Sequence, residues 1–114
     1  AAAWASRAEA TAARRAEALQ RLRALPGVEA VGAVGSGSPL SGSWRTNAIT
    51  VPGRPEFADA ADQVQIREVT PEYADVVRLR LREGRFVSRD DRAGAPPVVV
   101  LNEEAVRRFF GGRS

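Results

Sequence analysis

The sequence predicts an α+β fold in which a small mixed sheet is backed by helices. Three observations lead to this prediction. The first 25 residues contain neither glycine nor proline and are rich in helix-forming residues. Short apolar or alternating segments follow, separated by glycine- and proline-rich stretches, as is typical of strands and turns. An asparagine then introduces a final amphipathic segment that ends at two glycines, as a capped helix does.

The first element is a helix over Ala1–Leu25, which Pro26-Gly27 should end. A helix of that length is roughly 38 Å long, whereas a compact domain of this size is only about 35 Å across. We therefore expect the early turns to project while Leu19, Leu22 and Leu25 dock on the body. A functional stalk and a merely solubilising helix end both explain such a projection.

Four segments have the patterns of strands. Val28–Val34 is a short, largely apolar segment and Pro97–Leu101 is a continuous apolar run, and both favour buried strands. Gln63–Val69 instead alternates apolar and polar residues, which predicts a strand with one solvated face. Trp44–Val51 is the fourth candidate. The composition of residues 35–43 indicates a loop, and that of residues 52–55 indicates a turn.

Two further helices have sequence signals at their ends. Thr70 is expected to cap a short helix that contains Pro71 and Glu72 in its first turn and ends near residue 77. Asn102 should cap the last helix, which Gly111-Gly112 ends. The pair Phe109-Phe110 on this helix is expected to pack in the core.

The composition excludes several kinds of chemistry. The chain has no cysteine, histidine, methionine or lysine, and all 17 of its basic residues are arginine. It therefore lacks the residues for a thiolate zinc site, a Ser-His pair, a Schiff base or a phosphate-loop lysine. We expect no enzyme activity, no cofactor and no metal. No apolar run approaches the length that a membrane-spanning helix requires.

The remaining candidates for chemistry are weak. The glycines at positions 35, 37 and 42 do not have the spacing of a dinucleotide-binding loop. The acidic pairs Asp90-Asp91 and Asp59/Asp62 are typical of surface turns. Alternating Arg78, Arg80 and Arg82 would line one face of an extended segment. They suggest either a contact to nucleic acid or another anionic partner, or an edge strand protected by charge.

Four stretches in a fixed order resemble the MacB-like periplasmic core domain of FtsX-type ABC transporter permeases. They are Arg21–Val31 (RLRALPGVEAV), Ser38–Gly42 (SPLSG), Val69–Tyr73 (VTPEY) followed by Glu83–Phe86 (EGRF), and Pro97–Phe110 (PVVVLNEEAVRRFF). The resemblance runs from about residue 19 to residue 110. It implies framework roles for the motif residues Pro26, Gly27, Tyr73, Gly84, Arg85, Phe86 and Asn102.

The resemblance also implies a function. Such domains are porter-like, with ferredoxin-like βαβ elements, and lie on the periplasmic side of the cytoplasmic membrane. They are joined to the transmembrane helices and the ATPase of the same transporter, which acts as a dimer and can contact a periplasmic or outer-membrane partner. They transmit ATPase-driven motion for efflux, lipoprotein release or signalling. Residues 1–114 would then be one domain fragment of such a permease, with residues 1–25 as its stalk helix and no nucleic-acid partner. A small arginine-rich module that binds nucleic acid or another anionic partner is the alternative.

Overall fold

In the part of the chain that the computed structural model describes, three α-helices and a 3-10 helix accompany a two-stranded antiparallel sheet, an α+β architecture. The structure describes residues 2–35, 42, 45–57 and 63–112. Its elements, in chain order, are α1 (Ala2–Arg23), β1 (Arg45–Ala48), the 3-10 helix η1 (Pro55–Phe57), β2 (Gln63–Ile66), α2 (Tyr73–Val77) and α3 (Glu103–Phe110). The predicted α+β class is confirmed at this level.

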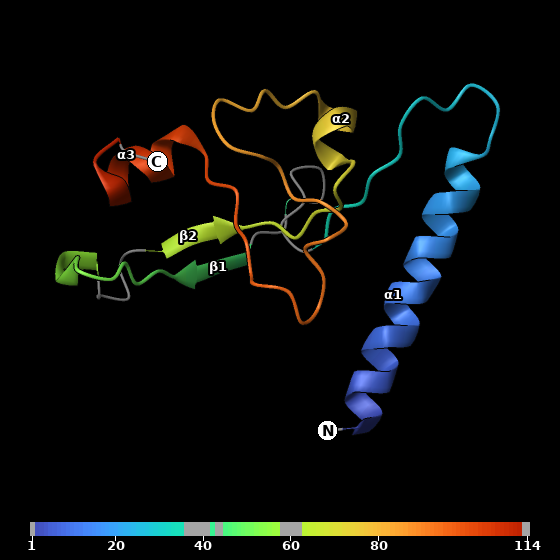
Figure 1. Cartoon of the computed structure of the whole chain (residues 1–114), viewed down its shortest axis with the longest axis horizontal. Coiled ribbons are helices and arrows are strands. Elements are labelled where there is room, and N and C mark those ends of the chain that lie inside the picture. The colour runs from blue at the N-terminus through green and yellow to red at the C-terminus, as the bar shows by residue number, and fades with distance from the viewer. Residues whose placement is uncertain (1, 36–41, 43–44, 58–62, 113–114) are drawn as a thin grey trace.

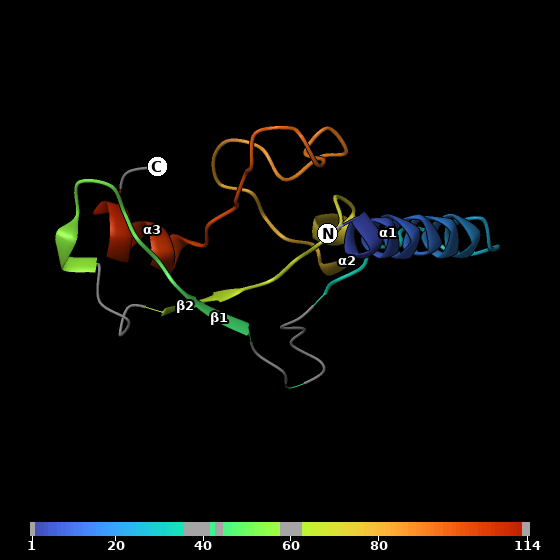
Figure 2. The same ribbon diagram turned by 90° about the horizontal axis from the view of Figure 1, so that it is seen from below.

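Helix α1 stands beside the remainder of the chain, which we call the body (Figures 1 and 2). The helix ends through a tight turn in which the Leu25 amide donates to the Leu22 carbonyl over 3.2 Å, and Gly27 adopts a φ of +79°. That left-handed conformation suits glycine, but the helix ends at Arg23, two residues before the predicted end at Leu25. The expected docking of the leucines is wrong for Leu22 and Leu25, which are 48% and 53% exposed.

The sheet is a hairpin formed by β1 and β2. Arg45 lies opposite Ile66 and Asn47 opposite Val64 in an antiparallel register. Val64 and Ile66 are half-buried and alternate with exposed glutamines, as the sequence predicts. Both strands are shorter than predicted, and Trp44 lies outside the described residues.

The turn at residues 52–55 is also confirmed. The Arg54 amide donates to the Val51 carbonyl over 2.9 Å, and Gly53 has a φ of +78°. This geometry uses the fixed φ of proline and the freedom of glycine at successive turn positions. The turn leads directly into η1.

The predicted strand at Val28–Val34 is wrong. The described part of this segment makes one isolated bridge, between Val34 and Val69, flanked by the Gly35 amide bound to the Glu68 carbonyl (2.7 Å) and the Thr70 amide bound to the Ala33 carbonyl (2.9 Å). Gly32 within the segment and Gly35 directly after it weaken strand formation, because glycine loses more backbone entropy on folding and has no side chain to pack. Residues 33–35 thus run alongside residues 68–70, which follow β2, without forming a regular ladder of hydrogen bonds.

The predicted central strand at Pro97–Leu101 is also wrong, since the run has no strand geometry in the structure. Its apolar side chains are exposed, and Val99 reaches 79%. A strand requires a neighbour that satisfies its backbone groups, and prolines 96 and 97 remove two of the donors such a ladder needs. The run therefore remains an irregular segment of the body that leads into α3.

The two short helices differ in how they begin. The predicted cap at Thr70 is wrong: the N-cap of α2 is Glu72, and the Thr70 hydroxyl oxygen instead accepts from the Ala33 amide over 2.9 Å. Asn102 caps α3 as predicted, because its side-chain oxygen accepts from the Ala105 amide over 2.8 Å. Gly111 ends α3 with a φ of 64°, as expected for a helix C-terminus.

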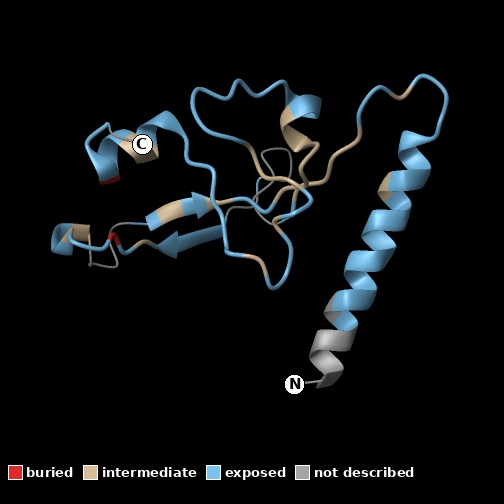
Figure 3. Ribbon diagram, in the orientation of Figure 1, coloured by how far each residue is buried: buried red, intermediate tan, exposed pale blue. Residues whose placement is uncertain are grey.

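The core of the described residues is small (Figure 3). Val51 and Phe109 are buried, with exposures of 7% and 2%. The Phe109 ring meets Phe57 of η1 edge-on at a centroid distance of 5.0 Å, a favourable aromatic geometry. The predicted core role is thus confirmed for Phe109, whereas Phe110 is 39% exposed and does not share it. This contact fixes α3 against the far end of the hairpin (Figure 1).

Candidate functional site at the end of helix α1

Two segments that are distant in the sequence lie in contact in the body. They are residues 31–35 and the residues that lead into α2, whereas the turn after α1 stands apart from them, and α1 reaches this place through the side chain of Arg23 (Figure 1). Gly32 passes so close to α2 that a Cβ built on it would lie 3.0 Å from the backbone N and Cα of Tyr73. This distance is shorter than nearly all Cβ contacts in proteins, so any larger residue at position 32 requires the backbone of Tyr73 to move.

A shared carboxylate joins the same segments by charge. Glu72 Oε1 accepts from Arg89 Nη2 at 2.8 Å and lies 3.3 Å from Nη2 of Arg23, the last residue of α1. The Glu72 side chain is 23% exposed. The hydrogen bond from Arg89 lowers the pKa of the Glu72 carboxyl below its ordinary value, and the charge of Arg23 adds to this effect. We call Arg23, Glu72 and Arg89 the Glu72 junction.

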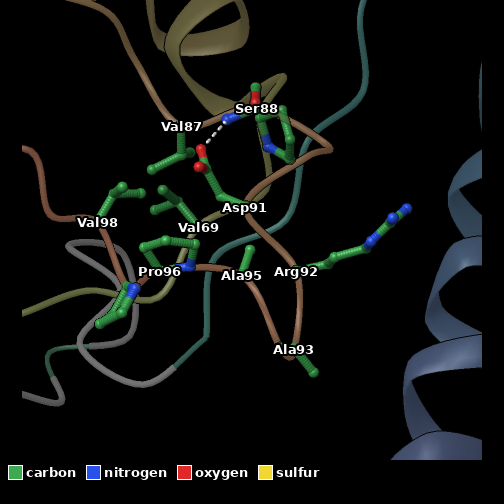
Figure 4. A pocket seen from close by; sticks show the side chains of 12 residues that line it. Val69, Val87, Ser88, Asp91, Arg92, Ala93, Ala95, Pro96 and Val98 are labelled. Carbon is green, nitrogen blue, oxygen red and sulfur yellow. Dashed lines mark hydrogen bonds between the residues drawn. The ribbon is translucent and has the colours of Figure 1, made fainter.

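The loop that carries Arg89 is closed by a second carboxylate. Asp91 accepts from Arg85 Nη1 and Nη2 at 2.7 and 2.8 Å and from the Ser88 amide at 2.7 Å. Figure 4 shows the Asp91 side chain directed at Ser88. The paired guanidinium holds the pKa of the Asp91 carboxyl well below its usual range. The fork-to-fork geometry fixes the loop between residues 85 and 91, and with it the position of Arg89.

A pocket of about 410 Å³ lies beside this loop. Its lining is mainly apolar, and Figure 4 shows Val69, Val87, Pro96 and Val98 around it, while the Arg92 side chain extends away toward α1. The only carboxylate in its lining, that of Asp91, is already bound by Arg85 and Ser88. Among residues 2–35, 42, 45–57 and 63–112, no group of three or more histidine, cysteine or acidic side chains could hold a metal ion.

The structure spreads the motif residues over four places. Pro26 and Gly27 form the turn after α1, and Tyr73 is the first residue of α2. Gly84 bends the chain with a φ of +72°. Asn102 lies apart from them, at the start of α3.

Arg85 and Phe86 follow that bend. Besides binding Asp91, the Arg85 guanidinium donates to the Phe86 carbonyl over 3.1 Å. The Phe86 residue itself is half-buried. The motif thus supplies the turn after α1, the start of α2 and the charged loop, all of which border the Glu72 junction.

The three alternating arginines have different surroundings. Arg78 ends α2 in the left-handed conformation, with a φ of 55°, so the extended segment expected from period two does not include Arg78. Arg82 Nε binds Glu103 Oε1 at 2.8 Å, at the first residue of α3. Residues two positions apart share a face only in an extended chain. The left-handed conformation of Arg78 interrupts the extended chain at the first of the three arginines.

Sequence reasoning missed the Glu72 junction. Glu72 was expected only as an acidic residue in a first helical turn, and Arg23 only as part of a long helix. The ion pairs join positions separated by 49 and 17 residues, and no local periodicity relates such positions. The Val69–Tyr73 motif does contain Glu72, and it was the available signal.

Among the described residues, none of the helices combines the length and the apolar character of a bilayer-spanning segment. Neither a curated protein nor a solved structure matches the chain significantly. A family model, described as the MacB-like periplasmic core domain, matches residues 2–114. This domain is a non-catalytic periplasmic component of ABC transporter permeases, which have transmembrane and ATPase parts. The chain therefore belongs to the family of MacB-like periplasmic core domains.

Proposed function

We propose that this domain transmits ATPase-driven motion to the periplasmic side of an FtsX-type permease and makes or breaks no bond itself. The transporter uses this motion for efflux, lipoprotein release or signalling. The observation that carries the proposal is α1, a 22-residue helix that stands beside the body and is bound to it at its end by the Glu72 junction. A rigid rod attached at one end is suited to carry displacement, because an α-helix keeps its length under load through its own hydrogen bonds.

The finer features of the proposal follow the family resemblance. Residues 1–25 act as a stalk, and residues 1–114 form one porter-like unit of a larger permease, in which Pro26, Gly27, Tyr73, Gly84, Arg85, Phe86 and Asn102 keep the framework. The permease works as a homodimer and contacts a periplasmic or outer-membrane partner. The placement of motif residues around the end of α1 supports this, since displacement of the helix enters the body there.

Hydrogen exchange in a permease that carries this domain tests the proposal. We expect amide protection in residues 28–35 and 68–77 to differ between nucleotide-free and ATP-bound states. Insertion of a short Gly-Ser segment between Gly27 and Val28, combined with Arg23→Gln, removes both the covalent coupling and the ion pair between α1 and the body, so it should abolish that difference while ATP hydrolysis continues.

A matched insertion at Gly53 is the control. It lengthens another exposed turn but leaves the path from α1 intact, so the nucleotide-dependent difference should persist. Identical protection of the body in all nucleotide states of the unmodified permease would refute the proposed transmission.

A further inference from the structure

We infer that the Glu72 junction is a releasable ionic latch, which holds α1 in one direction relative to the body and frees it when the contact of Arg23 with Glu72 breaks. This inference rests on the proposed function, because it names the contact through which motion of α1 reaches the body. It concerns a conformational device, and no nucleotide is needed to observe it.

The covalent connection alone does not fix the direction of α1. After the helix, the chain makes a turn at Gly27, with the Val28 amide bound to the Leu25 carbonyl over 3.3 Å, and Glu29 and Ala30 are exposed. Leu22 and Leu25, the large apolar side chains near this end, are about half exposed. Apolar packing at the described end of α1 is therefore slight, and the ion pair from Arg23 supplies the directional contact.

The body side of the latch is held in place. Glu72 is the N-cap of α2, and Gly32 packs directly on the backbone of the residue that follows it. Arg89 donates a hydrogen bond to Glu72 Oε1, the same oxygen that lies nearest to Arg23. The loop that carries Arg89 is closed by the Arg85–Asp91 pair. Glu72 is thus oriented before Arg23 arrives, and release occurs on the α1 side.

The strength of this contact suits release rather than permanent attachment. The Arg23 side chain is 40% exposed and its distance to Glu72 is the longer of the two, at 3.3 Å against 2.8 Å. A solvent-exposed ion pair shifts a two-state equilibrium by about fivefold at most. Salt weakens it, because the Debye length falls from about 10 Å at 0.1 M to about 3 Å at 1 M.

Pulsed electron paramagnetic resonance on the 114-residue chain tests the inference. The chain has no cysteine, so Ala10→Cys in α1 and Gln65→Cys in β2 provide two unique sites for nitroxide labels on exposed residues. Glu72→Gln, which keeps the size of the side chain, should reduce the ratio of latched to released α1 by up to about fivefold and broaden the distance distribution. Raising the salt from about 0.1 to about 1 M should broaden the distribution of the original chain but not that of Glu72→Gln.

Matched variants make the test specific. Arg23→Gln should reproduce the effect of Glu72→Gln on the direction of α1, and combining both should add nothing, since each removes the one ion pair that joins α1 to Glu72. Arg21→Gln removes the Arg21–Glu17 pair within α1 and should leave the distribution unchanged. Circular dichroism checks that each variant keeps its helices, and the salt series on the original chain needs no variant.

A distribution for Glu72→Gln as narrow as that of the original chain would overturn the latch. So would broadening by salt to the same extent in both chains. Because this experiment contains neither ATPase nor nucleotide, its failure leaves the hydrogen-exchange test of the proposed function standing. Failure of the exchange test would in turn leave the latch observable but without its assigned role.

Discussion

Neighbouring residues of the same type have different roles in the charged loop. Asp90 and Asp91 form an acidic pair that, in the sequence, is typical of a surface turn, and the structure does place them in a turn. Only Asp91 receives the two guanidinium bonds of Arg85, and its side chain is 13% exposed. The sequence predicts the turn but not this difference, because it depends on the direction in which Gly84 bends the chain.

Replacing Asp91 by asparagine should destabilise the domain in a pH-dependent way. The folded-state pKa of the carboxyl lies below its unfolded value of about 3.9. Its contribution to stability is therefore complete above about pH 5 and is lost as the pH falls through the folded pKa. Urea unfolding should show a lower midpoint for Asp91→Asn than for the original chain at pH 7. The difference between the two midpoints should be smaller at pH 3.

Asp90→Asn is the control for that experiment, because it removes an adjacent carboxylate that lacks the guanidinium bonds. Its midpoint should stay close to that of the original chain at both pH values. Equal effects of the two substitutions would contradict the assigned role of the Arg85–Asp91 pair.

Gly32→Ala should destabilise the junction between α1 and the body. Its new Cβ would lie 3.0 Å from two backbone atoms of Tyr73, which have no rotamer to change. Forcing a methyl group into such a contact costs about 1–3 kcal/mol. Gly35→Ala meets Cβ and Oε2 of Glu68 at 3.3 Å, a longer distance than at Gly32, and the Glu68 carboxylate can rotate away, so its loss of stability should be smaller in the same urea measurement. A Gly32→Ala chain as stable as Gly35→Ala would show that the approach is not tight.

At the scale of secondary-structure elements, the sequence predicts helix caps and turns better than it predicts strands. Asn102, Gly111, Gly27 and Gly53 were identified correctly because caps and turns depend on residues a few positions apart. Pro97–Leu101 was not, because an apolar run forms a strand only beside a partner that satisfies its backbone. Local pattern therefore describes where an element can form, and tertiary contacts decide whether it does.

Phe109→Ala should remove most of the packing between α3 and the hairpin. Phe109 is 2% exposed and meets Phe57 edge-on, so truncation should cost about 3–5 kcal/mol of the free energy of unfolding. Phe110→Ala removes the same side chain from an exposed position of the same helix and should cost far less. Comparable urea midpoints for the two variants would contradict the placement of the core at Phe109.

The whole molecule is more extended than its length requires. Its radius of gyration is 16.5 Å, whereas a compact domain of 114 residues has about 13 Å. The projecting α1 and the small core between η1 and α3 account for this difference (Figures 1 and 3). The length of the predicted first helix indicated a projection, but the charged junction at its end could not be foreseen, because it joins residues from three distant segments.

The family could be recognised from the order of short motifs, even though two of the strands expected within them are absent from the described structure. Gly27 still turns the chain after α1, and Asn102 still caps α3, where two of these motifs place them. The candidate site needed the structure, because Arg23, Glu72 and Arg89 become neighbours only when the chain folds.

The most direct test of transmitted motion uses a permease that carries this domain, with Gln65→Cys labelled in each copy. Pulsed electron paramagnetic resonance then measures the distance between the two labels in nucleotide-free and vanadate-trapped states. We predict that the distance differs between the states, and that the difference vanishes when the ATPase is inactivated by mutation. Identical distributions in both states, or no dipolar coupling between copies, would contradict the account.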